Sequence, residues 1–501
     1  MAHIAIIGAG IGGLTAAMRL AYEGHKVEIF ERANQVGGKM RQVASPAGPV
    51  DAGPTVLTMR DVFEAAFQAA GTRLSDHITL HAAPVTARHF WRDAPVLDFY
   101  ADLDRTINAV EEWGGRSAKE DFEAFQSDIA LLFRSFEASM MYSDAPSLTQ
   151  TVLKTLSSGK LLKMLARGQT LESYLNRRFR EPRLAQLFGR YATYVGGTPD
   201  AVPMVLGLIA KSEANGVWSV EGGMHQLAKT MGAIAIQHGA SLHLNTSVER
   251  LDAGPKIVLS DGQTLKLDKV LFNGDPAALY HGLLGPGPTR AVDHAAVSPR
   301  ALSAHVWTFA ASPKGRDLSH HNVFFAKTPN SEFRDLASGK TPEDPTLYIC
   351  AQDRTEGPTT GTERFEIIMN ANASADLFQL QKEKSICTEI CFQRLRDFGL
   401  NFTPKPDVNS LTGPAEFAHL FPGSDGSLYG RSPSGMMAPF QRPTTRSRMT
   451  GVYLCGGGVH PGAGIPMASL SGQHAAAAIM KDLISTSRSR RTVTRGGMST
   501  A

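Results

Sequence analysis

The sequence predicts an α/β fold with three parts: a discontinuous α/β domain, a mixed β-sheet domain and a helical subdomain. Two glycine-rich strand–turn–helix patterns, near opposite ends of the chain, predict the first part. A long segment with apolar residues at helical spacing, followed by a block of β-rich runs, predicts the other two. A chain of 501 residues also exceeds one ordinary core, so two or three domains are expected.

The first glycine-rich pattern opens the chain. An apolar run at 4–7 predicts a strand, and the helical pattern after it stops at Gly24. Between them stand Gly8, Gly10 and Gly13. In a dinucleotide site the first glycine makes the tight turn, the second lets the backbone approach the pyrophosphate, and the third permits close packing of helix on strand. The pattern predicts a Rossmann-like dinucleotide site at a helix N-terminus; the alternative is a glycine-rich turn in an ordinary βαβ unit.

A second strand, at 27–30, leads directly to Glu31. An acidic residue near this spacing hydrogen-bonds a ribose hydroxyl and repels a 2′-phosphate. The expected ligand is therefore adenosine-like and lacks the phosphate of NADP.

The residues after the acid favour FAD over NAD. Gly38, with the glycine before it, permits a second close approach of the backbone, and Lys39 can reach a phosphate or the flavin edge. Pro54 and Thr55 follow as further cofactor-binding candidates. FAD is longer than a mononucleotide and must be held along its length, so contacts from distant segments are expected.

The second glycine-rich pattern supplies such contacts near the end of the chain. A strand at 451–454 precedes Gly457 and Gly458, and a small-residue helix is expected to begin near Pro466, with Met467 beside it. The positive end of that helix would face flavin N1 and the C2 carbonyl, where negative charge appears on reduction. We therefore expect the head and the tail of the chain to meet at one flavin site; the alternative is a glycine loop before an ordinary packed helix.

Composition limits the remaining classes of function. The chain is 42% hydrophobic and 20% charged, which is typical of a folded, soluble-type protein. The net charge of +4 equals the arginines of the segment 485–501, which is expected to be a basic, disordered tail. The rest is close to neutral, which argues against a nucleic-acid partner. The tail arginines are Arg488, Arg490, Arg491 and Arg495.

Further observations concern the compartment and the membrane. Four cysteines in a chain this long suggest a reducing environment, and the first strand leaves no room for a signal peptide, so a cytoplasmic protein is expected. No apolar stretch approaches transmembrane length. The segment 151–167 is nevertheless basic and amphipathic, and is either an interfacial helix or a surface helix with a solvated basic face. Its leucines and basic residues are Leu153, Leu156, Leu161, Leu162, Leu165, Lys154, Lys160, Lys163 and Arg167.

The positions of the patterns predict the domain organisation. The FAD-binding domain would be discontinuous, with Val248 offering backbone hydrogen bonds to adenine. The helical subdomain would carry a stripe of apolar residues at helical spacing that is expected to be core, made of Phe122, Phe125, Ile129, Leu132, Phe136 and Met140. The expected boundaries are 1–75, 216–290 and 410–484 for the FAD-binding domain, 76–102 and 291–409 for the β-rich substrate domain, and 103–215 for the helical, possibly membrane-facing subdomain.

With these segments in place, the chain resembles the phytoene desaturase-like FAD oxidoreductases, and most closely the bacterial 1-hydroxycarotenoid 3,4-desaturases of phototrophs. The flavin patterns point only to the broader superfamily, and the middle segments make the finer assignment. Val459 departs from the threonine frequent in relatives, which puts a hydroxyl contact to the cofactor in doubt. The matching segments are IIGAGIGGL, VDAGPTVLTMR, RLAQLFGRYATYVGG, HHNVFF, PTLYICAQDR, RFEIIMN and HPGAGIPMA.

The resemblance implies a desaturase that introduces a C3–C4 double bond into acyclic carotenoids with a tertiary hydroxyl at C1, of the hydroxyneurosporene and hydroxylycopene type. Removal of two hydrogens requires a hydride acceptor, which flavin supplies. Loss of an allylic hydride leaves a cation delocalised along the polyene, so a weak base suffices. A lipid-dissolved substrate favours peripheral attachment to the inner face of the membrane. The rival functions are a phytoene-type desaturase of unhydroxylated carotenoids, a flavin-dependent carotenoid isomerase and a carotenoid carrier.

Two sets of titratable residues are candidates for catalysis or metal binding. His460 is the candidate base, because it lies in the flavin pattern beside a predicted helix N-terminus; the alternative is a hydrogen bond that shapes the glycine loop. His320 and His321 are not expected to bind a metal, because adjacent side chains seldom converge. Cys387 and Cys391 share a helix face but are expected to be core residues.

Overall fold

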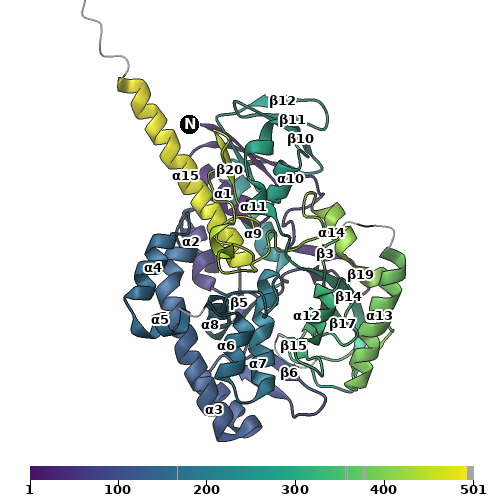
Figure 1. Ribbon diagram of the computed structural model, residues 1–501. Coiled ribbons are helices and arrows are strands. Elements are labelled where there is room, and N and C mark those ends of the chain that lie inside the picture. Colours follow the sequence, from purple (N-terminus) through teal and green to yellow (C-terminus); the bar gives the residue numbers. More distant parts are fainter. Residues whose placement is uncertain (166–167, 356, 358, 375, 377–379, 493–501) are drawn as a thin grey trace, which may run out of the picture.

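The computed structural model describes residues 1–165, 168–355, 357, 359–374, 376 and 380–492 (Figure 1). One lobe contains the N-terminus and the last described helix, α15, and a second lobe contains the largest sheet and most of the helices (Figure 1). None of the helices in these ranges combines the length and the apolar content needed to cross a bilayer.

A five-stranded parallel sheet forms the centre of the first lobe, in the order β20-β13-β1-β2-β9. Its strands read as continuous apolar runs because both faces are covered. Ile4 and Ile6 face a layer of helices, whereas Ala5 and Ile7 face the opposite side, as the alternation of a strand requires. The strands are β1 His3–Ile7, β2 Lys26–Phe30, β9 Ser241–His243, β13 Lys269–Phe272 and β20 Val452–Leu454.

Helices cover one face of this sheet, and a small antiparallel sheet covers the other. The helices are α1 Ile11–Tyr22, α2 Arg60–Gln68, α9 His225–Gln237 and α15 Ile465–Thr492. The opposite side holds β10 Val248–Asp252, β11 Lys256–Leu259, β12 Thr264–Lys266, α10 Pro276–Tyr280, the 3-10 turn Gly287–Arg290 and α11 His294–Val297. Two two-stranded antiparallel sheets complete the lobe: β3 Arg41–Val43 with β4 Val50–Ala52, and β5 Leu80–Ala82 with β8 Trp218–Val220.

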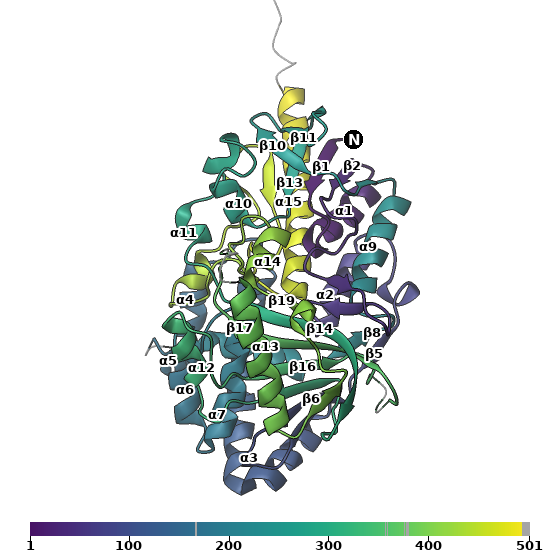
Figure 2. The ribbon, with the colours of Figure 1, turned by 90° about the vertical axis from the view of Figure 1, so that its right-hand side faces the viewer.

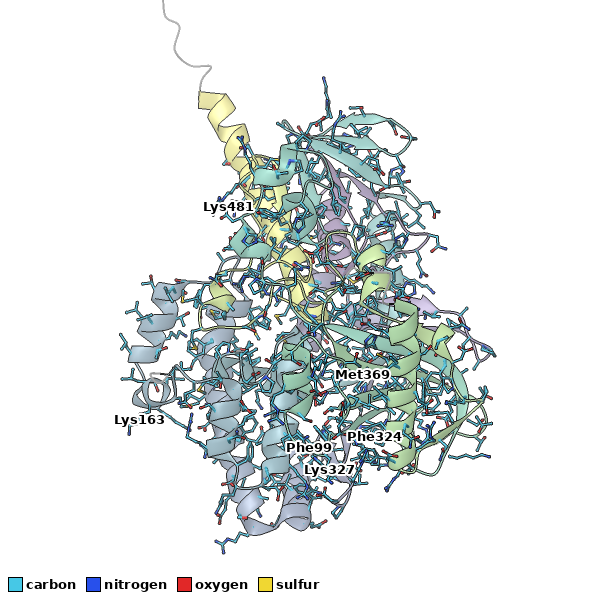
Figure 3. All side chains as sticks on the ribbon, turned by 45° about the vertical axis from the view of Figure 1, so that its right-hand side comes forward. Phe99, Lys163, Phe324, Lys327, Met369 and Lys481 are labelled. Carbon is cyan, nitrogen blue, oxygen red and sulfur yellow. The ribbon has the colours of Figure 1, made fainter. Side chains whose placement is uncertain are left out.

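The second lobe is built on an eight-stranded sheet in the order β18-β14-β17-β16-β15-β6-β7, with β19 paired to β14. Figure 2 shows α13 lying across one face, where Phe324 and Met369 belong to the shared core (Figure 3). The opposite face turns toward the helical segment and the cavity described below. The elements are β6 Val85–Phe90, β7 Leu97–Tyr100, β14 Ser303–Lys314, β15 His321–Phe324, β16 Leu347–Ala351, β17 Glu363–Ala371, β18 Asn401–Thr403, β19 Leu411–Thr412, α12 Ser331–Ala337, α13 Leu380–Asp397 and α14 Pro414–Leu420.

The helical segment packs around an aromatic core. Phe122, Phe125, Ile129 and Leu132 of α3 are fully buried there, as the stripe predicted, because residues at this spacing share one helix face. Asp102 caps α3 by accepting a hydrogen bond from the Arg105 N–H. The helices are α3 Leu103–Phe136, α4 Leu148–Leu156, α5 Gly159–Leu165, α6 Leu171–Arg178, α7 Pro182–Gly189 and α8 Ile209–Ala214, with short turns at Glu137–Met141, Arg190–Val195 and Met204–Leu208. Other short turns, outside this segment, are Leu74–Asp76, Val408–Ser410 and Ala438–Phe440.

Two boundaries differ from the prediction. The expected disordered tail does not begin at 485, because α15 continues to Thr492; residues 493–501 lie outside the described residues. The segment 410–484 does not belong wholly to the first lobe, because β19 at its start pairs with β14 of the large sheet. Cys387 and Cys391 lie on the buried face of α13, in the core that it shares with the large sheet, as expected.

Candidate flavin and substrate site

A cavity of about 1200 Å³ lies between the two lobes. Its walls include every sequence-predicted cofactor residue except Gly13, which lies behind the first glycine loop. The predicted residues that line it are Gly8, Gly10, Glu31, Gly38, Lys39, Pro54, Thr55, Val248, Gly457, Gly458, His460, Pro466 and Met467.

The first glycine loop leaves backbone groups open toward this cavity. Gly8 has φ +100°, a conformation that favours glycine, and its N–H donates to Phe30 O at 2.8 Å. Gly10 precedes α1 without a side-chain cap, so N–H groups of the first turn remain available for an anion. A Cβ at Gly13 would lie 2.4 Å from Gly8 O, so helix and strand touch here.

Glu31 stands at the carboxyl end of β2 and ties two turns together. Its Oε2 accepts from the Ala9 N–H at 2.8 Å, and its Oε1 accepts from the Ala33 N–H at 2.9 Å. The Thr246 N–H donates to Glu31 O, which brings the strand that carries Val248 alongside. Each carboxylate oxygen retains a lone pair, so a ribose could still bind.

Asn273 is a site residue that the sequence reasoning missed. Its Nδ2 donates to Gly8 O at 3.0 Å, and its Oδ1 accepts from Cys455 Sγ at 3.3 Å, so one amide joins the two glycine patterns. The signal was its position directly after β13, because the carboxyl ends of parallel strands meet at the ligand crevice.

The head and the tail of the chain do meet, as expected. A Cβ at Gly472 of α15 would lie 2.2 Å from Gly12 O of α1, so the two helices cross at backbone contact. Thr15 Oγ1 and Ser469 Oγ are 3.1 Å apart across the same crossing. The expected start of the C-terminal helix near Pro466 is also confirmed, because α15 begins at Ile465.

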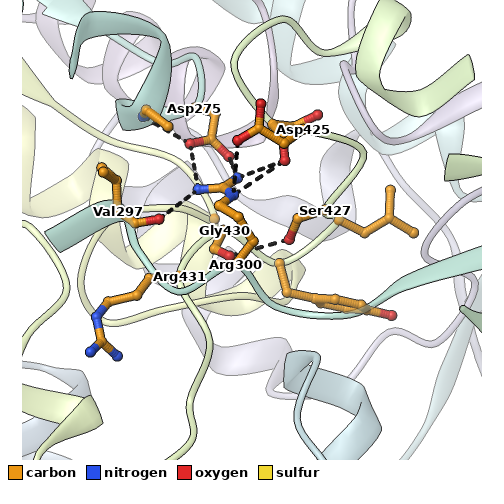
Figure 4. A network of polar contacts seen from close by, with 12 residues as sticks. Asp275, Val297, Arg300, Asp425, Ser427, Gly430 and Arg431 are labelled. Carbon is orange, nitrogen blue, oxygen red and sulfur yellow. Dashed lines mark hydrogen bonds and ion pairs between the residues drawn. The ribbon is translucent and has the colours of Figure 1, made fainter. Parts of the chain in front are cut away.

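Lys39 lies half-buried in the cavity wall. Its Nζ donates to Leu428 O at 2.5 Å. Burial lowers the Lys39 pKa to about 8, with Asp275 opposing this shift and the Arg300 and Arg442 cations adding to it. Arg300 in turn donates to Asp275 Oδ2 at 2.5 Å and to Ser424 O at 3.0 Å, and the second contact anchors the loop that presents Leu428 (Figure 4).

The Pro54–Thr55 segment connects the cofactor half of the cavity to the large sheet. Thr55 Oγ1 and Tyr348 Oη lie 2.9 Å apart, and the Gly53 N–H donates to Glu366 Oε1 at 2.5 Å. Glu366 is fully buried, and its Oε2 has no hydrogen-bond partner within the described residues. Burial raises the pKa of Glu366 to about 8, although the hydrogen bond from the Gly53 N–H and the Arg41 cation each lower it.

This pKa predicts a pH dependence of stability. The folded protein keeps a proton on Glu366 that the unfolded chain releases near the ordinary value of 4.5. Stability from this group is therefore full below pH 4.5 and is lost as the pH rises through about 8, by up to ~1.4 kcal/mol per pH unit. Glu366→Gln should flatten this decline in urea unfolding curves, whereas Glu343→Gln on the surface should not. Equal slopes for wild type and Glu366→Gln would contradict the assignment.

His460 lies buried in the second glycine loop. Its Nε2–H donates to Ser143 O at 3.0 Å, which leaves Nδ1 as the acceptor. Burial lowers its pKa to about 4, so the ring is neutral, as expected; burial rather than the predicted helix terminus is the main cause.

The expectation that the adjacent side chains of His320 and His321 do not converge is wrong. The ligand atoms of His320, His321 and Cys350 lie within 4.8 Å of one another, with His320 Nε2 and Cys350 Sγ 3.6 Å apart. Burial raises the pKa of the Cys350 thiol and lowers that of both rings, which favours the neutral forms of all three. The absence of a metal site stays a prediction.

The half of the cavity away from the glycine loops is mainly apolar. Phe136 and Met140, which the sequence assigned to a core stripe, line it together with Leu206 and Ile209. From the large sheet, alternate residues of β14 and β17 face the same space. These include Ala304, Val306 and Ile368.

Three features of the site fit an adenine dinucleotide: glycines where a Cβ would fill the space, open N–H groups at the start of α1, and a carboxylate at the end of the second strand. The apolar half of the cavity leaves room for the substrate of an oxidoreductase. Fold and site thus define a two-lobed, FAD-dependent oxidoreductase. The chain belongs to the flavin containing amine oxidoreductase family, whose sequence model matches residues 11–480.

Three curated relatives are similar in sequence to this chain over nearly its whole length. The chain is 47% identical over 490 residues to a hydroxyneurosporene desaturase of Cereibacter sphaeroides, covering 97% of this chain and 99% of that protein. Proteins of the same name from Rhodobacter capsulatus and Rubrivivax gelatinosus are 43% and 41% identical, covering 97% and 99% of this chain and 99% and 97% of their own lengths.

Solved structures share the fold at low identity. An oxidoreductase from Methanosarcina mazei superposes with a TM-score of 0.57 at 15% identity, covering 95% of this chain and 99% of that chain. Putrescine oxidase gives 0.58 at 10% identity, covering 96% and 99%. A fatty acid isomerase from P. acnes gives 0.57 at 12% identity, covering 96% and 98%. The predicted fold class is therefore confirmed.

Proposed function

We propose that this chain is an FAD-dependent desaturase that introduces the C3–C4 double bond into acyclic 1-hydroxycarotenoids. The observation that carries the proposal is 41–47% identity to three hydroxyneurosporene desaturases over nearly the full chain. The apolar extension of a cavity of about 1200 Å³ supports it, because a long polyene needs such a space.

The chain's own residues would bind and orient the reactants. When bound, FAD supplies the acceptor for the hydride that the substrate loses. Gly8, Gly10 and the α1 N-terminus would hold the pyrophosphate, and Glu31 the ribose. Val248 would meet the adenine, and Lys39 a phosphate or the flavin edge. The remaining proposed contacts are Gly38, Pro54, Thr55, Gly457, Gly458, Pro466 and Met467, with Gly13 packing behind the loop.

The decisive experiment incubates the purified holoprotein with 1-hydroxyneurosporene and follows absorption and product mass. The expected product absorbs at longer wavelength and has lost two hydrogens. A product of unchanged mass would instead indicate an isomerase. Faster turnover of phytoene or neurosporene than of the hydroxylated carotenoid would indicate a phytoene-type desaturase.

We infer that His460 accepts the proton that leaves after the hydride. A pKa of about 4 suits this weak base, since the substrate cation is itself a strong acid. His460→Ala should keep bound flavin and lower single-turnover flavin reduction by about 100-fold, because the cation must lose its proton before the reaction is committed.

The matched control is His474→Ala. His474 is similarly held by a backbone carbonyl, that of Met141, but does not line the cavity. Its reduction rate should stay near wild type. If His460→Ala reduces its flavin at the wild-type rate, or merely loses flavin, the ring shapes the glycine loop and is not the base.

We also propose that α4 attaches the protein peripherally to the inner face of the membrane. This helix has no buried residue, and Leu153 and Leu156 are each 61% exposed. Lys154 and Lys163 are exposed around it, and Lys163 lies at the outer edge of the molecule (Figure 3). Leu161, predicted to share this surface, is instead buried.

The position of α4 would connect the bilayer to the cavity. Thr151 of α4 donates to Met140 Sδ at 3.6 Å, and Met140 lines the cavity. A carotenoid that leaves the bilayer at α4 would therefore have a short path to the apolar half of the cavity.

Leu153→Glu should weaken binding to anionic liposomes by about 10-fold or more, because burial of one leucine side chain contributes about 1.5–3 kcal/mol. Flotation of the purified protein measures this. Ile236→Glu, at an apolar residue that is 49% exposed on α9, should leave flotation unchanged. Equal flotation of wild type and Leu153→Glu would remove α4 from the membrane contact.

A further inference from the structure

Three polar residues form a cluster in the wall of the mainly apolar part of the cavity, and we call Arg190, Tyr194 and Glu213 the polar triad. Tyr194 Oη donates to Glu213 Oε2 at 2.9 Å and accepts from Arg190 Nη2 at 2.9 Å. Tyr191 Oη donates to the other carboxylate oxygen, Glu213 Oε1, at 2.7 Å but does not line the cavity.

Arg190 has more donors than partners. Its side chain is 8% exposed, and within the described residues its single hydrogen bond is the one to Tyr194. A guanidinium carries five N–H donors, and leaving them unpaired in a buried site is costly. The neighbouring rings of His89 and His321 are neutral, because burial and the Arg190 charge both lower their pKa. The triad is therefore short of an acceptor.

The triad lies close to the cofactor half of the cavity. Tyr348 lines the same wall, and its Oη contacts both Thr55 Oγ1 at 2.9 Å and His321 Nδ1 at 2.8 Å. The charge of Arg190 in turn helps to lower the pKa of His321. Tyr348 and His321 thus lie between the Thr55 segment, which is proposed to contact the flavin, and the neighbourhood of Arg190.

We propose that the polar triad binds the C1 hydroxyl of the substrate, with Arg190 donating to the hydroxyl oxygen and the hydroxyl proton pointing to Glu213. This inference rests on the proposed function and names its specificity determinant. A C3–C4 bond begins two bonds from C1, so a hydroxyl recognised here keeps the reacting carbons near the cofactor. A neutral alcohol suits the site better than a carboxylate, because Glu213 already offsets the Arg190 charge.

The test compares kcat/KM for 1-hydroxyneurosporene and neurosporene in holoenzyme variants. Wild type should favour the hydroxylated carotenoid. Arg190→Leu and Tyr194→Phe should each lower kcat/KM for 1-hydroxyneurosporene by roughly 10- to 100-fold, because a hydrogen bond to a charged or buried group is lost. Turnover of neurosporene should change by less than about threefold, and Arg190→Lys should restore part of the preference.

Tyr191→Phe is the matched control. It removes the same phenol group and the same kind of contact to Glu213, but from outside the cavity, so its substrate preference should equal that of wild type. Flavin content and melting temperature identify variants that do not fold. If Arg190→Leu does not fold, the substrate preference of Tyr194→Phe tests the proposal.

The possible failures are distinct. If wild type prefers the hydroxylated carotenoid and the triad variants keep that preference, or lose both substrates equally, the triad does not recognise the hydroxyl and the proposed function stands. If wild type turns over neither carotenoid, or prefers neurosporene, the proposed function fails and the triad assignment fails with it.

Discussion

Gly472→Ala is expected to separate the two ends of the chain and to release the flavin. The added methyl group would lie 2.2 Å from Gly12 O and 3.0 Å from Thr15 Cβ, so α1 and α15 must move apart. Both helices begin at glycine loops that line the cavity, and a shift of either displaces the backbone proposed to hold the cofactor. Overpacking of this kind costs about 1–3 kcal/mol. Purified protein should be depleted of flavin, with a lower melting temperature.

Gly159→Ala provides the control, because Gly159 opens α5 and a Cβ there would meet nothing within 4 Å. Alanine at a helical glycine normally stabilises by about 0.5–1 kcal/mol, so this variant should be neutral or slightly more stable. Full flavin content and a wild-type melting temperature for Gly472→Ala would show that the helix crossing does not set the cofactor site.

Glu31→Gln should weaken FAD binding by roughly 10- to 100-fold. One carboxylate oxygen becomes an NH₂ group that faces the N–H of Ala9 or Ala33, so a charge-assisted hydrogen bond worth about 1.5–3 kcal/mol is replaced by a donor–donor contact. The first glycine loop then loses a support as well as a ribose ligand. Titration of apoprotein with FAD, followed by fluorescence quenching, gives the dissociation constants.

Glu28→Gln is the matched control on the same strand. Glu28 is paired with His3 and Lys26 and does not line the cavity, so its loss should change stability without changing FAD affinity. An unchanged dissociation constant for Glu31→Gln would place the ribose elsewhere.

Strand and helix positions around the cofactor site were predictable because their signals are local. The strands at 4–7, 27–30 and 451–454 follow from continuous apolar runs, and the structure has β1, β2 and β20 there to within a residue. The glycines between strand and helix are required by backbone conformation and close approach, which depend on a few neighbouring residues.

Other features depend on contacts between segments far apart in the chain. Residue type alone does not reveal that Asn273 joins both glycine patterns, since its partners Gly8 and Cys455 lie 265 and 182 residues away. The convergence of His320 and Cys350 is not predictable from the sequence for the same reason, because β15 and β16 pair only in the folded sheet.

Fold class, family and cofactor can be predicted from the amino-acid order alone, because glycine spacing and apolar periodicity follow from the local conformation of the backbone. Which polar side chains share the cavity depends on how distant segments pack. Arg190 lies in the short turn Arg190–Val195 and Glu213 in α8, and Tyr194 joins them. The crossing of α1 with α15 depends on two glycines that are 460 residues apart, Gly12 and Gly472. Such pairings are set by packing, in which burial and close contact select partners irrespective of their separation along the chain.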